Sequence, residues 1–198
     1  MLAIDVSTSM LAEDLKPNRL EAAKDVAAEF INGRPNDNIG ITLFAGETFT
    51  QCPLTVDHAV LLDMIHNIKC GLITDGTAVG MGIANAVTRL KDSKAKSKVI
   101  ILLTDGTNNK GDISPMTAAE IAKSFGIRVY TIGVGTNGMA PYPYPVGNTV
   151  QYVSMPVEID EKTLTEIAGT TDGNYFRATS NSKLKEVYEE IDKLEKTK

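Results

Sequence analysis

Three oxygen-bearing side chains stand at alternate positions near the beginning of the chain, at Asp5, Ser7 and Ser9. They follow the apolar run 2–4, which predicts a strand, and alternate residues of an extended segment point to the same side. One carboxylate and two hydroxyls that share a direction suit a hard divalent cation such as Mg²⁺, which prefers oxygen ligands. The same residues are also compatible with the end of a strand followed by a Ser/Thr cluster that caps a helix. The rest of the chain decides between these two interpretations.

Two more oxygen-bearing residues are expected at the same edge of the fold. Asp105 follows the apolar run 99–104 in a Thr-Asp-Gly turn, and Thr77 begins the small-residue helix expected at 78–90. The carboxyl ends of parallel strands form the edge at which α/β sheets bind ligands. If the strands before Asp5 and Asp105 are neighbours, oxygen ligands from three loops converge on one crevice. Two carboxylates then balance the charge of Mg²⁺, or of Mn²⁺ or Ca²⁺, which this donor set does not distinguish.

The order of the elements predicts an open, mostly parallel α/β sheet of the Rossmann-like kind, with helices on both faces. Strands are expected at 2–4, 39–45, 48–54, 99–104, 127–134 and 174–178, and helices at 19–32, 56–68, 78–90, 114–125, 160–169 and 181–196. The turn at 46–47 is short, so the segment 48–54 is expected to be an antiparallel edge strand with Pro53 at its end. A polar loop is expected between Met10 and Asn18.

Residues 137–158 interrupt this alternation of strands and helices. The segment contains four prolines and three tyrosines, with Gly147 and Asn148 as a turn. Prolines cannot donate hydrogen bonds to the central ladders of a sheet. The segment is therefore expected to form an inserted hairpin or surface flap that stands off the core.

The chain has 198 residues, of which 42% are hydrophobic and 23% charged, which is typical of one globular domain rather than a disordered segment. Its net charge of −5 gives no electrostatic support for nucleic-acid binding. No apolar run approaches the length of a membrane span, and no signal-peptide pattern is present. The first strand nonetheless begins close to the N-terminus, which suggests a single domain, residues 1–198, cut from a longer protein. Cys52 and Cys70 are expected to be free thiols, because a helix between them would hold them beyond bridging distance.

These features resemble a von Willebrand factor type A domain that carries a metal-ion-dependent adhesion site (MIDAS). In that family, Asp-x-Ser-x-Ser follows the first strand, as it does here at 5–9. The family's Thr ahead of a helix matches Thr77, which stands five residues before the helix glycine Gly82, and its Thr-Asp-Gly aspartate matches Asp105. The resemblance covers essentially the whole chain and all the ligand positions. It implies that the bound ion keeps an open coordination position, which the Asp or Glu side chain of a partner protein fills.

Three further residues lie beside the expected ligands. Met10 and Gly106 are expected to shape the rim on which the partner rests. Asp75, two residues before Thr77, is compatible with an outer-shell position, although a solvated loop carboxylate is the simpler interpretation.

Several shorter stretches are similar to the bacterial aerotolerance (Bat) family of membrane-anchored von Willebrand A proteins. These stretches are 3–14 with Pro17 and Arg19-Leu20, 50–54, the Pro/Tyr-rich insert and 175–178. The similarity implies membrane helices outside this domain. It also implies a periplasmic position in a complex of the cell envelope.

Two classes of function remain open, a metal-dependent protein-binding module without catalysis and a magnesium-dependent enzyme acting on phosphate or carboxylate substrates at the same crevice. An enzyme needs a general base or nucleophile near the metal, but the ligand loops contain no His, Lys or Cys, and Lys110 is the nearest basic residue. The Gly-rich run 133–138 fits a dinucleotide pattern, but prolines follow where a helix should begin. His58 and His66 are eight residues apart on one expected helix and are not spaced as a metal pair. We therefore favour the binding module with a protein partner.

Overall fold

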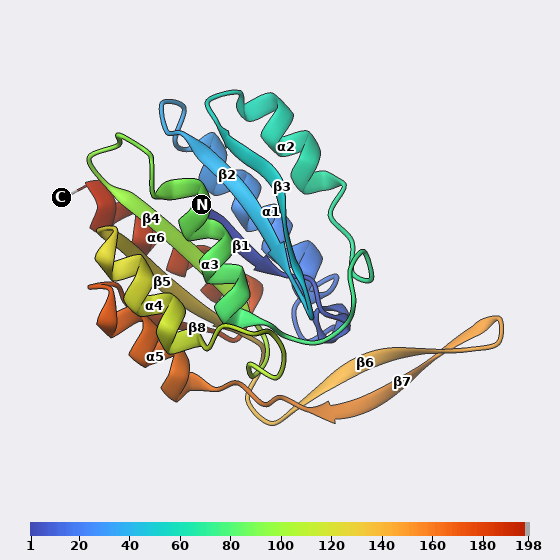
Figure 1. Cartoon of the computed structure of the whole chain (residues 1–198). Helices are drawn as coiled ribbons and strands as arrows, with labels where there is room; N and C mark the ends of the chain where they lie inside the picture. Colours follow the sequence, from blue (N-terminus) through green and yellow to red (C-terminus); the bar gives the residue numbers. More distant parts are fainter. Residues whose placement is uncertain (197–198) are drawn as a thin grey trace.

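The computed structural model describes residues 1–196, and a six-stranded sheet in the order β3-β2-β1-β4-β5-β8 forms its centre (Figure 1). The strands are β1 (Leu2–Asp5), β2 (Ile39–Phe44), β3 (Thr48–Thr55), β4 (Lys98–Thr104), β5 (Ile127–Val134) and β8 (Tyr175–Ala178). All neighbouring pairs run parallel except β2 and β3, which pair antiparallel at one edge. The predicted mostly parallel sheet with an antiparallel edge strand is confirmed.

The middle of the sheet is the place where the strand order changes direction. From β1 the chain moves outward to β2 and β3 on one side, and from β4 it moves outward to β5 and β8 on the other. β1 and β4 are direct neighbours, with Leu2 opposite Ile101 and Ile4 opposite Leu103. Such a switch point opens a crevice outside the carboxyl ends of the two central strands.

Helices cover both faces of the sheet, as predicted. One face carries α1 (Arg19–Asn32), α2 (His58–His66) and α6 (Asn181–Lys196), and the other carries α3 (Val79–Leu90), α4 (Pro115–Ser124) and α5 (Glu161–Thr170). Each face encloses its own buried cluster, with Leu20 and Ile191 in the first and Ile83 and Ile167 in the second. Strands that are buried from both sides explain the wholly apolar runs in the sequence.

Polar caps set where several helices begin. The side chain of Asn18 accepts a hydrogen bond from the amide of Glu21 and caps α1, and Asp160 caps α5 in the same way. Asp57 caps α2, so this helix begins at His58 rather than at residue 56. The predicted helices are therefore correct in number and order, with bounds that differ by one or two residues.

The segment between Met10 and Asn18 is not the polar loop that the sequence predicts. The short 3₁₀ helix η1 (Thr8–Leu11) turns the chain back over the core. As a result, Met10 and Leu15 are fully buried and Ala12 is 4% exposed. These apolar side chains anchor the segment to the domain.

The insert forms a separate two-stranded antiparallel sheet made of β6 (Met139–Val146) and β7 (Thr149–Pro156), joined at Gly147 and Asn148. Figure 1 shows this β6–β7 ribbon projecting from the body of the domain. Every residue of β7 is exposed. The expected hairpin that stands off the core is confirmed.

Within residues 1–196, no helix is long and apolar enough to cross a membrane. Cys52 is buried, and both Cys52 and Cys70 are free thiols, as expected.

Candidate metal centre

The two candidate carboxylates lie side by side at the carboxyl edge of the sheet. Asp5 is the last residue of β1, and Asp105 directly follows β4. Because β1 and β4 are neighbouring parallel strands, both side chains reach the crevice at the switch point. Both are buried, with 0% and 3% of their surface exposed.

Hydrogen bonds join the Asp-x-Ser-x-Ser loop to the turn after β4. The hydroxyl of Ser9 donates to Oδ1 of Asp105 at 2.7 Å, and the hydroxyls of Ser7 and Ser9 lie 3.0 Å apart. The amide of Ser7 donates to Oδ1 of Asp5 at 2.9 Å, and the hydroxyl of Thr104 donates to its Oδ2 at 2.6 Å. Four of the predicted ligands therefore form one connected cluster of oxygen atoms.

Thr77 enters the cluster from a third loop. A Cβ atom built on Gly106 would lie 3.4 Å from Oγ1 of Thr77, so this hydroxyl faces the turn that carries Asp105. Asn109 fixes the backbone of Thr77 by accepting from its amide and donating to its carbonyl, each at 2.9 Å. The glycine at position 106 thus leaves room for the Thr77 side chain beside Asp105.

The chemistry of this donor set fits a hard divalent cation. Within residues 1–196, no group of three or more His, Cys, Asp and Glu side chains gathers as a metal site, so a cation at this crevice depends on hydroxyls as well as on Asp5 and Asp105. Burial, followed by repulsion from Asp105, raises the pKa of Asp5 to about 7. Burial also raises the pKa of Asp105, although Arg19 opposes this. Two buried carboxylates beside one guanidinium leave a deficit of positive charge that a cation would offset.

Arg19 and Asp14 form a buried network behind the crevice that sequence reasoning did not identify as part of the site. Nη1 of Arg19 donates to Oδ2 of Asp105 at 2.8 Å, while its Nε and Nη2 donate to the two carboxylate oxygens of Asp14 at 2.7 and 2.6 Å. Asp14 also accepts from the amide of Thr136 at 2.8 Å. The sequence contains one hint that Arg19 pairs with a carboxylate. Arg19 is the first residue of α1, where the helix dipole disfavours a cation, so a nearby negative charge is needed to offset it.

Among the residues around the site, one expectation needs correction and one needs more detail. Met10 does not shape a rim, because its side chain is fully buried in the core beneath the loop. Asp75 is an exposed loop carboxylate, as expected, and its oxygens accept from the amide and the hydroxyl of Thr8 at 3.0 and 2.7 Å. Burial opposes the shift, but these hydrogen bonds hold the pKa of Asp75 below its ordinary value. Asp75 therefore ties the loop after β1 to the loop before Thr77.

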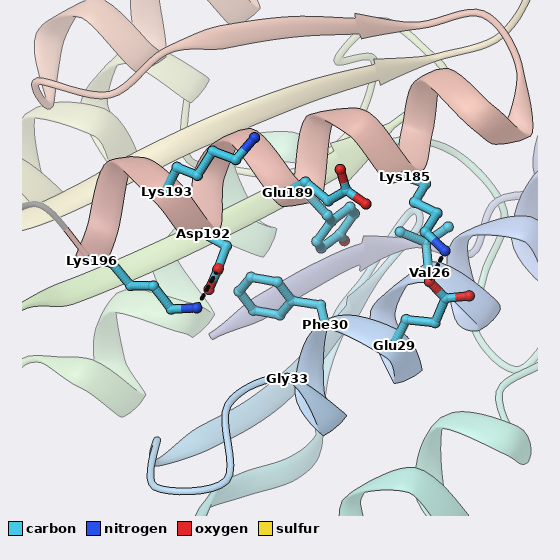
Figure 2. A pocket seen from close by; sticks show the side chains of 10 residues that line it. Val26, Glu29, Phe30, Gly33, Lys185, Glu189, Asp192, Lys193 and Lys196 are labelled. Carbon is cyan, nitrogen blue, oxygen red and sulfur yellow. Dashed lines mark ion pairs between the residues drawn. The ribbon is translucent and has the colours of Figure 1, made fainter.

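A second hollow, of about 310 Å³, lies between α1 and α6 (Figure 2). Charged side chains at its border pair with one another, with Lys185 2.8 Å from Glu29 and Lys196 2.6 Å from Asp192. The ring of Phe30 packs edge-on against a tyrosine of α6 in the same place. These contacts explain the hollow as a seam between two packed helices, and none of the candidate ligands lies there.

The sequence model of the von Willebrand factor type A domain matches residues 1–190. The chain belongs to the von Willebrand factor type A family. Among its relatives are an uncharacterized protein of Borreliella burgdorferi, 28% identical over 98% of this chain, and a UPF0353 protein of Nocardia farcinica, 32% identical over 97% of it. The chain spans only 58% and 61% of the length of these two relatives.

Solved structures place the chain among the Bat-like members of this von Willebrand A family. BatB from Bacteroides thetaiotaomicron is 34% identical with a TM-score of 0.84, and the match covers 98% of this chain and 97% of that one. An aerotolerance-related membrane protein from Bacteroides fragilis is 32% identical, also with a TM-score of 0.84, over 98% and 96% of the two chains. Proximal thread matrix protein 1 from the mussel byssus, solved with a zinc-occupied MIDAS motif, is 25% identical with a TM-score of 0.74, over 98% of this chain and 44% of that one. A von Willebrand A domain of this fold can therefore hold a divalent metal at its MIDAS motif.

Proposed function

We propose that this von Willebrand A domain binds one divalent cation through Asp5, Ser7, Ser9, Thr77 and Asp105 and uses it to bind a carboxylate of a protein partner. The observation that carries the proposal is the junction of three loops at the β1–β4 switch point. There Ser9 from the first loop donates to Asp105 from the second, and Thr77 from the third faces Gly106.

Charge and coordination explain why a partner's carboxylate suits this site. Asp5 and Asp105 balance a divalent charge, whereas the three hydroxyls contribute oxygen without charge. A cation held there would supply a Lewis-acidic position that accepts one more anionic oxygen. Mg²⁺ is the proposed ion, with Mn²⁺ or Ca²⁺ as the alternatives that an all-oxygen donor set also accepts.

The side chains around the proposed metal site favour binding of a partner rather than catalysis. The nearest thiol, Cys70, donates to the carbonyl oxygen of Ser7 at 3.4 Å. Burial, followed by the charges of Asp5 and Asp105, raises the pKa of Cys70 to about 12, so it is a thiol rather than a thiolate at neutral pH. Arg19 is fully engaged by carboxylates and is no base. A magnesium-dependent enzyme would need a group that these loops do not supply.

For the whole protein, we propose a membrane-anchored member of a cell-envelope complex of the aerotolerance type. Residues 1–198 would form its single von Willebrand A domain, on the periplasmic side. The support is the similarity to BatB and to the Bacteroides fragilis membrane protein, together with the greater length of the curated relatives.

Calorimetric titration of Mg²⁺ and Mn²⁺ into wild type and variants tests the metal site. Asp5→Ala and Asp105→Ala each remove a charged ligand and should nearly abolish binding, whereas Thr77→Ala removes a neutral oxygen and should weaken it less. Asp57→Asn is the matched control, because it removes a carboxylate at the cap of α2 and leaves a residue that still caps. If both alanine variants at Asp5 and Asp105 bind metal as wild type does, the ligand assignment is wrong.

The carboxylate-bridging role needs a separate measurement. Capture of partner proteins from membrane extract should require a divalent cation, should stop with a chelator, and should fail with Asp105→Ala. Capture that survives the chelator unchanged would remove the metal from the interface.

A further inference from the structure

A cavity of about 490 Å³ lies between the metal loop and the β6–β7 ribbon. Thr8 and Ser9 line one side of it, so it is continuous with the candidate metal centre. Its opposite wall is one face of the ribbon, formed by Ala140, Tyr142, Tyr144, Val153 and Met155. This volume lies in the range of sites that accept small ligands or single large side chains.

The lining of this cavity is mostly apolar, although one charged residue belongs to it. Arg19 borders the cavity, but its Nε, Nη1 and Nη2 atoms all donate to Asp14 and Asp105. The ribbon adds no charge, because residues 137–157 contain no Asp, Glu, Lys or Arg. The space beside the metal loop therefore favours an uncharged, apolar group.

Contacts at its base hold the ribbon over this space. The amide of Glu13 donates to the carbonyl of Pro141 at 2.9 Å, and the hydroxyl of Tyr152 donates to the carboxylate of Glu13 at 3.0 Å. Ala140 is 3% exposed, so the start of β6 is packed against the domain. The cavity is thus formed before any partner arrives, and a partner need not order the ribbon to use it.

The ribbon also concentrates exposed apolar surface. Seven of the twelve exposed large hydrophobic side chains within residues 1–196 belong to it, namely Met139, Tyr144, Val146, Val150, Tyr152, Val153 and Met155. Exposed apolar patches of this kind mark interaction sites in soluble domains. Three of them, Tyr144, Val153 and Met155, line the cavity beside the proposed carboxylate site, so one partner segment can cover both.

We propose that the cavity receives a large apolar side chain that neighbours the metal-binding Asp or Glu of the partner. This inference rests on the proposed function and adds a specificity to it, namely an acidic residue flanked by an aromatic or long aliphatic residue. The metal binds the partner's carboxylate, and the apolar wall formed by the ribbon selects the type of residue that flanks this Asp or Glu in the partner. An acidic residue flanked by small or charged residues leaves the cavity unfilled or places charge in it, and binds more weakly.

Small carboxylates can test carboxylate binding at the metal separately from apolar binding in the cavity. We would titrate acetate, 3-phenylpropionate and 5-phenylpentanoate into ¹⁵N-labelled protein with Mg²⁺ and with EDTA, following backbone amide shifts. Acetate should shift loop amides at residues 7–9 only with Mg²⁺. At least one phenylalkanoate should bind about tenfold more tightly than acetate, since burial of a phenyl ring is worth at least that factor. Its shifts should extend to ribbon residues 140–144 and 153–155, again only with Mg²⁺.

A matched pair of variants on β7 tests the cavity wall. Val153 and Val150 are both exposed, at 47% and 57%, but they point to opposite faces because they are three residues apart on a strand. Of these two valines, only Val153 lines the cavity. Val153→Gln places a neutral amide in the cavity and should reduce phenylalkanoate affinity to that of acetate, while Val150→Gln should leave it unchanged.

The outcomes distinguish this inference from the function on which it rests. If acetate gives no Mg²⁺-dependent shift, the carboxylate-binding function itself fails. If acetate binds with Mg²⁺ but neither phenylalkanoate binds more tightly, the apolar subsite is wrong and the metal function stands. Equal losses with Val153→Gln and Val150→Gln would also overturn the subsite.

Discussion

Arg19 holds two buried carboxylates at once, those of Asp14 and Asp105. The Asp14 and Asp105 side chains are 2% and 0% exposed, so water cannot replace the guanidinium if it is removed. A buried charge that loses its partner is costly, whereas a pair at the surface contributes little. Arg19 therefore supports the position of a candidate metal ligand without reaching the crevice as a ligand itself.

Arg19→Gln should lower the free energy of unfolding by about 3 to 5 kcal/mol in the metal-free protein, the cost of breaking a buried pair. Arg19→Lys should also be destabilised, because an ammonium cannot reproduce the planar fork that contacts both carboxylates. Lys183→Gln is the control, since it removes an exposed pair with Glu186 and should change stability by less than about 1 kcal/mol. Urea denaturation in EDTA measures all three. A loss at Arg19→Gln as small as that of the control would show that the network is not needed for stability.

The sequence reveals part of this site and conceals another part. Asp5 and Asp105 each end an apolar strand, so their shared edge follows from chain order once the sheet is parallel. Arg19 and Asp105 are separated by 86 residues, so the unusual place of a cation at the start of α1 does not reveal which carboxylate it pairs with. Asp75 was ambiguous for the same reason, because its partner Thr8 lies 67 residues away. A strand end can be recognised from the local sequence. The contacts of Arg19 with Asp105 and of Asp75 with Thr8 instead depend on tertiary packing between distant segments.

At the scale of elements, α3 packs with glycines directly against neighbouring segments. A Cβ atom at Gly80 would lie 2.0 Å from the carbonyl oxygen of Ile113, in the loop before α4. One at Gly82 would lie 2.7 Å from the ring of Phe44 in β2. This close approach fixes the beginning of α3, whose first residue, Val79, stands two positions after Thr77.

Gly80→Ala and Gly169→Ala should change stability in opposite directions. The methyl group at position 80 meets backbone that cannot move aside, so we expect a loss of about 1 to 3 kcal/mol. At position 169 in α5 nothing lies within 4 Å of the added Cβ, so alanine should stabilise the helix by about 0.5 kcal/mol. Thermal unfolding of both variants measures these changes in stability. Two gains of similar size would mean that helix propensity rather than packing governs these sites.

The β6–β7 ribbon is an element added to the fold rather than part of its core. Met139 is paired with Pro156 at its base, and the amide of Val157 donates to the carbonyl of Gly138 at 2.8 Å just below. Joining Met139 to Pro156 through an Asn-Gly turn should therefore close the gap without strain. We expect cooperative unfolding and a stability within about 2 kcal/mol of wild type, because most deleted side chains are exposed. Loss of cooperative unfolding by circular dichroism would contradict this.

Element order was predictable here, and local turns were less so. Apolar runs separated by helical periods indicate a parallel sheet, and four prolines in one segment exclude it from that sheet. The 3₁₀ turn of η1 gave no periodic signal, because one short turn is too brief to show a pattern. Met10 was consequently expected at the rim, although it lies in the core. The projecting ribbon was predictable as a hairpin, but its position over the metal loop depends on contacts from Glu13 that no local pattern indicates.

Across the whole molecule, charge is concentrated unfavourably at one edge of the sheet. The chain carries a net charge of −5. Asp5 and Asp105 are buried together, and within residues 1–196 the only ion pair with either of them is the one between Arg19 and Asp105. Asp5 itself is hydrogen-bonded by neutral donors, from Ser7 and Thr104. Folding in the absence of a cation therefore includes the cost of bringing these carboxylates together, and a ligand that binds only the folded state recovers it.

A divalent cation should consequently stabilise the whole domain against unfolding through this one site. At a concentration one hundred times its dissociation constant, Mg²⁺ should add about 2.7 kcal/mol, or roughly 5 to 10 °C in Tm for a domain of this size. Asp105→Asn should show no comparable rise, because the substitution removes one of the two charges that balance the ion. Asp57→Asn, which removes a carboxylate far along the chain at the cap of α2, should rise as wild type does. Thermal unfolding would be followed at constant ionic strength, since a chain of net charge −5 is also stabilised by general screening. If Asp105→Asn gains as much as wild type, the stabilisation comes from screening or from another site, and the crevice between β1 and β4 is not where the cation binds.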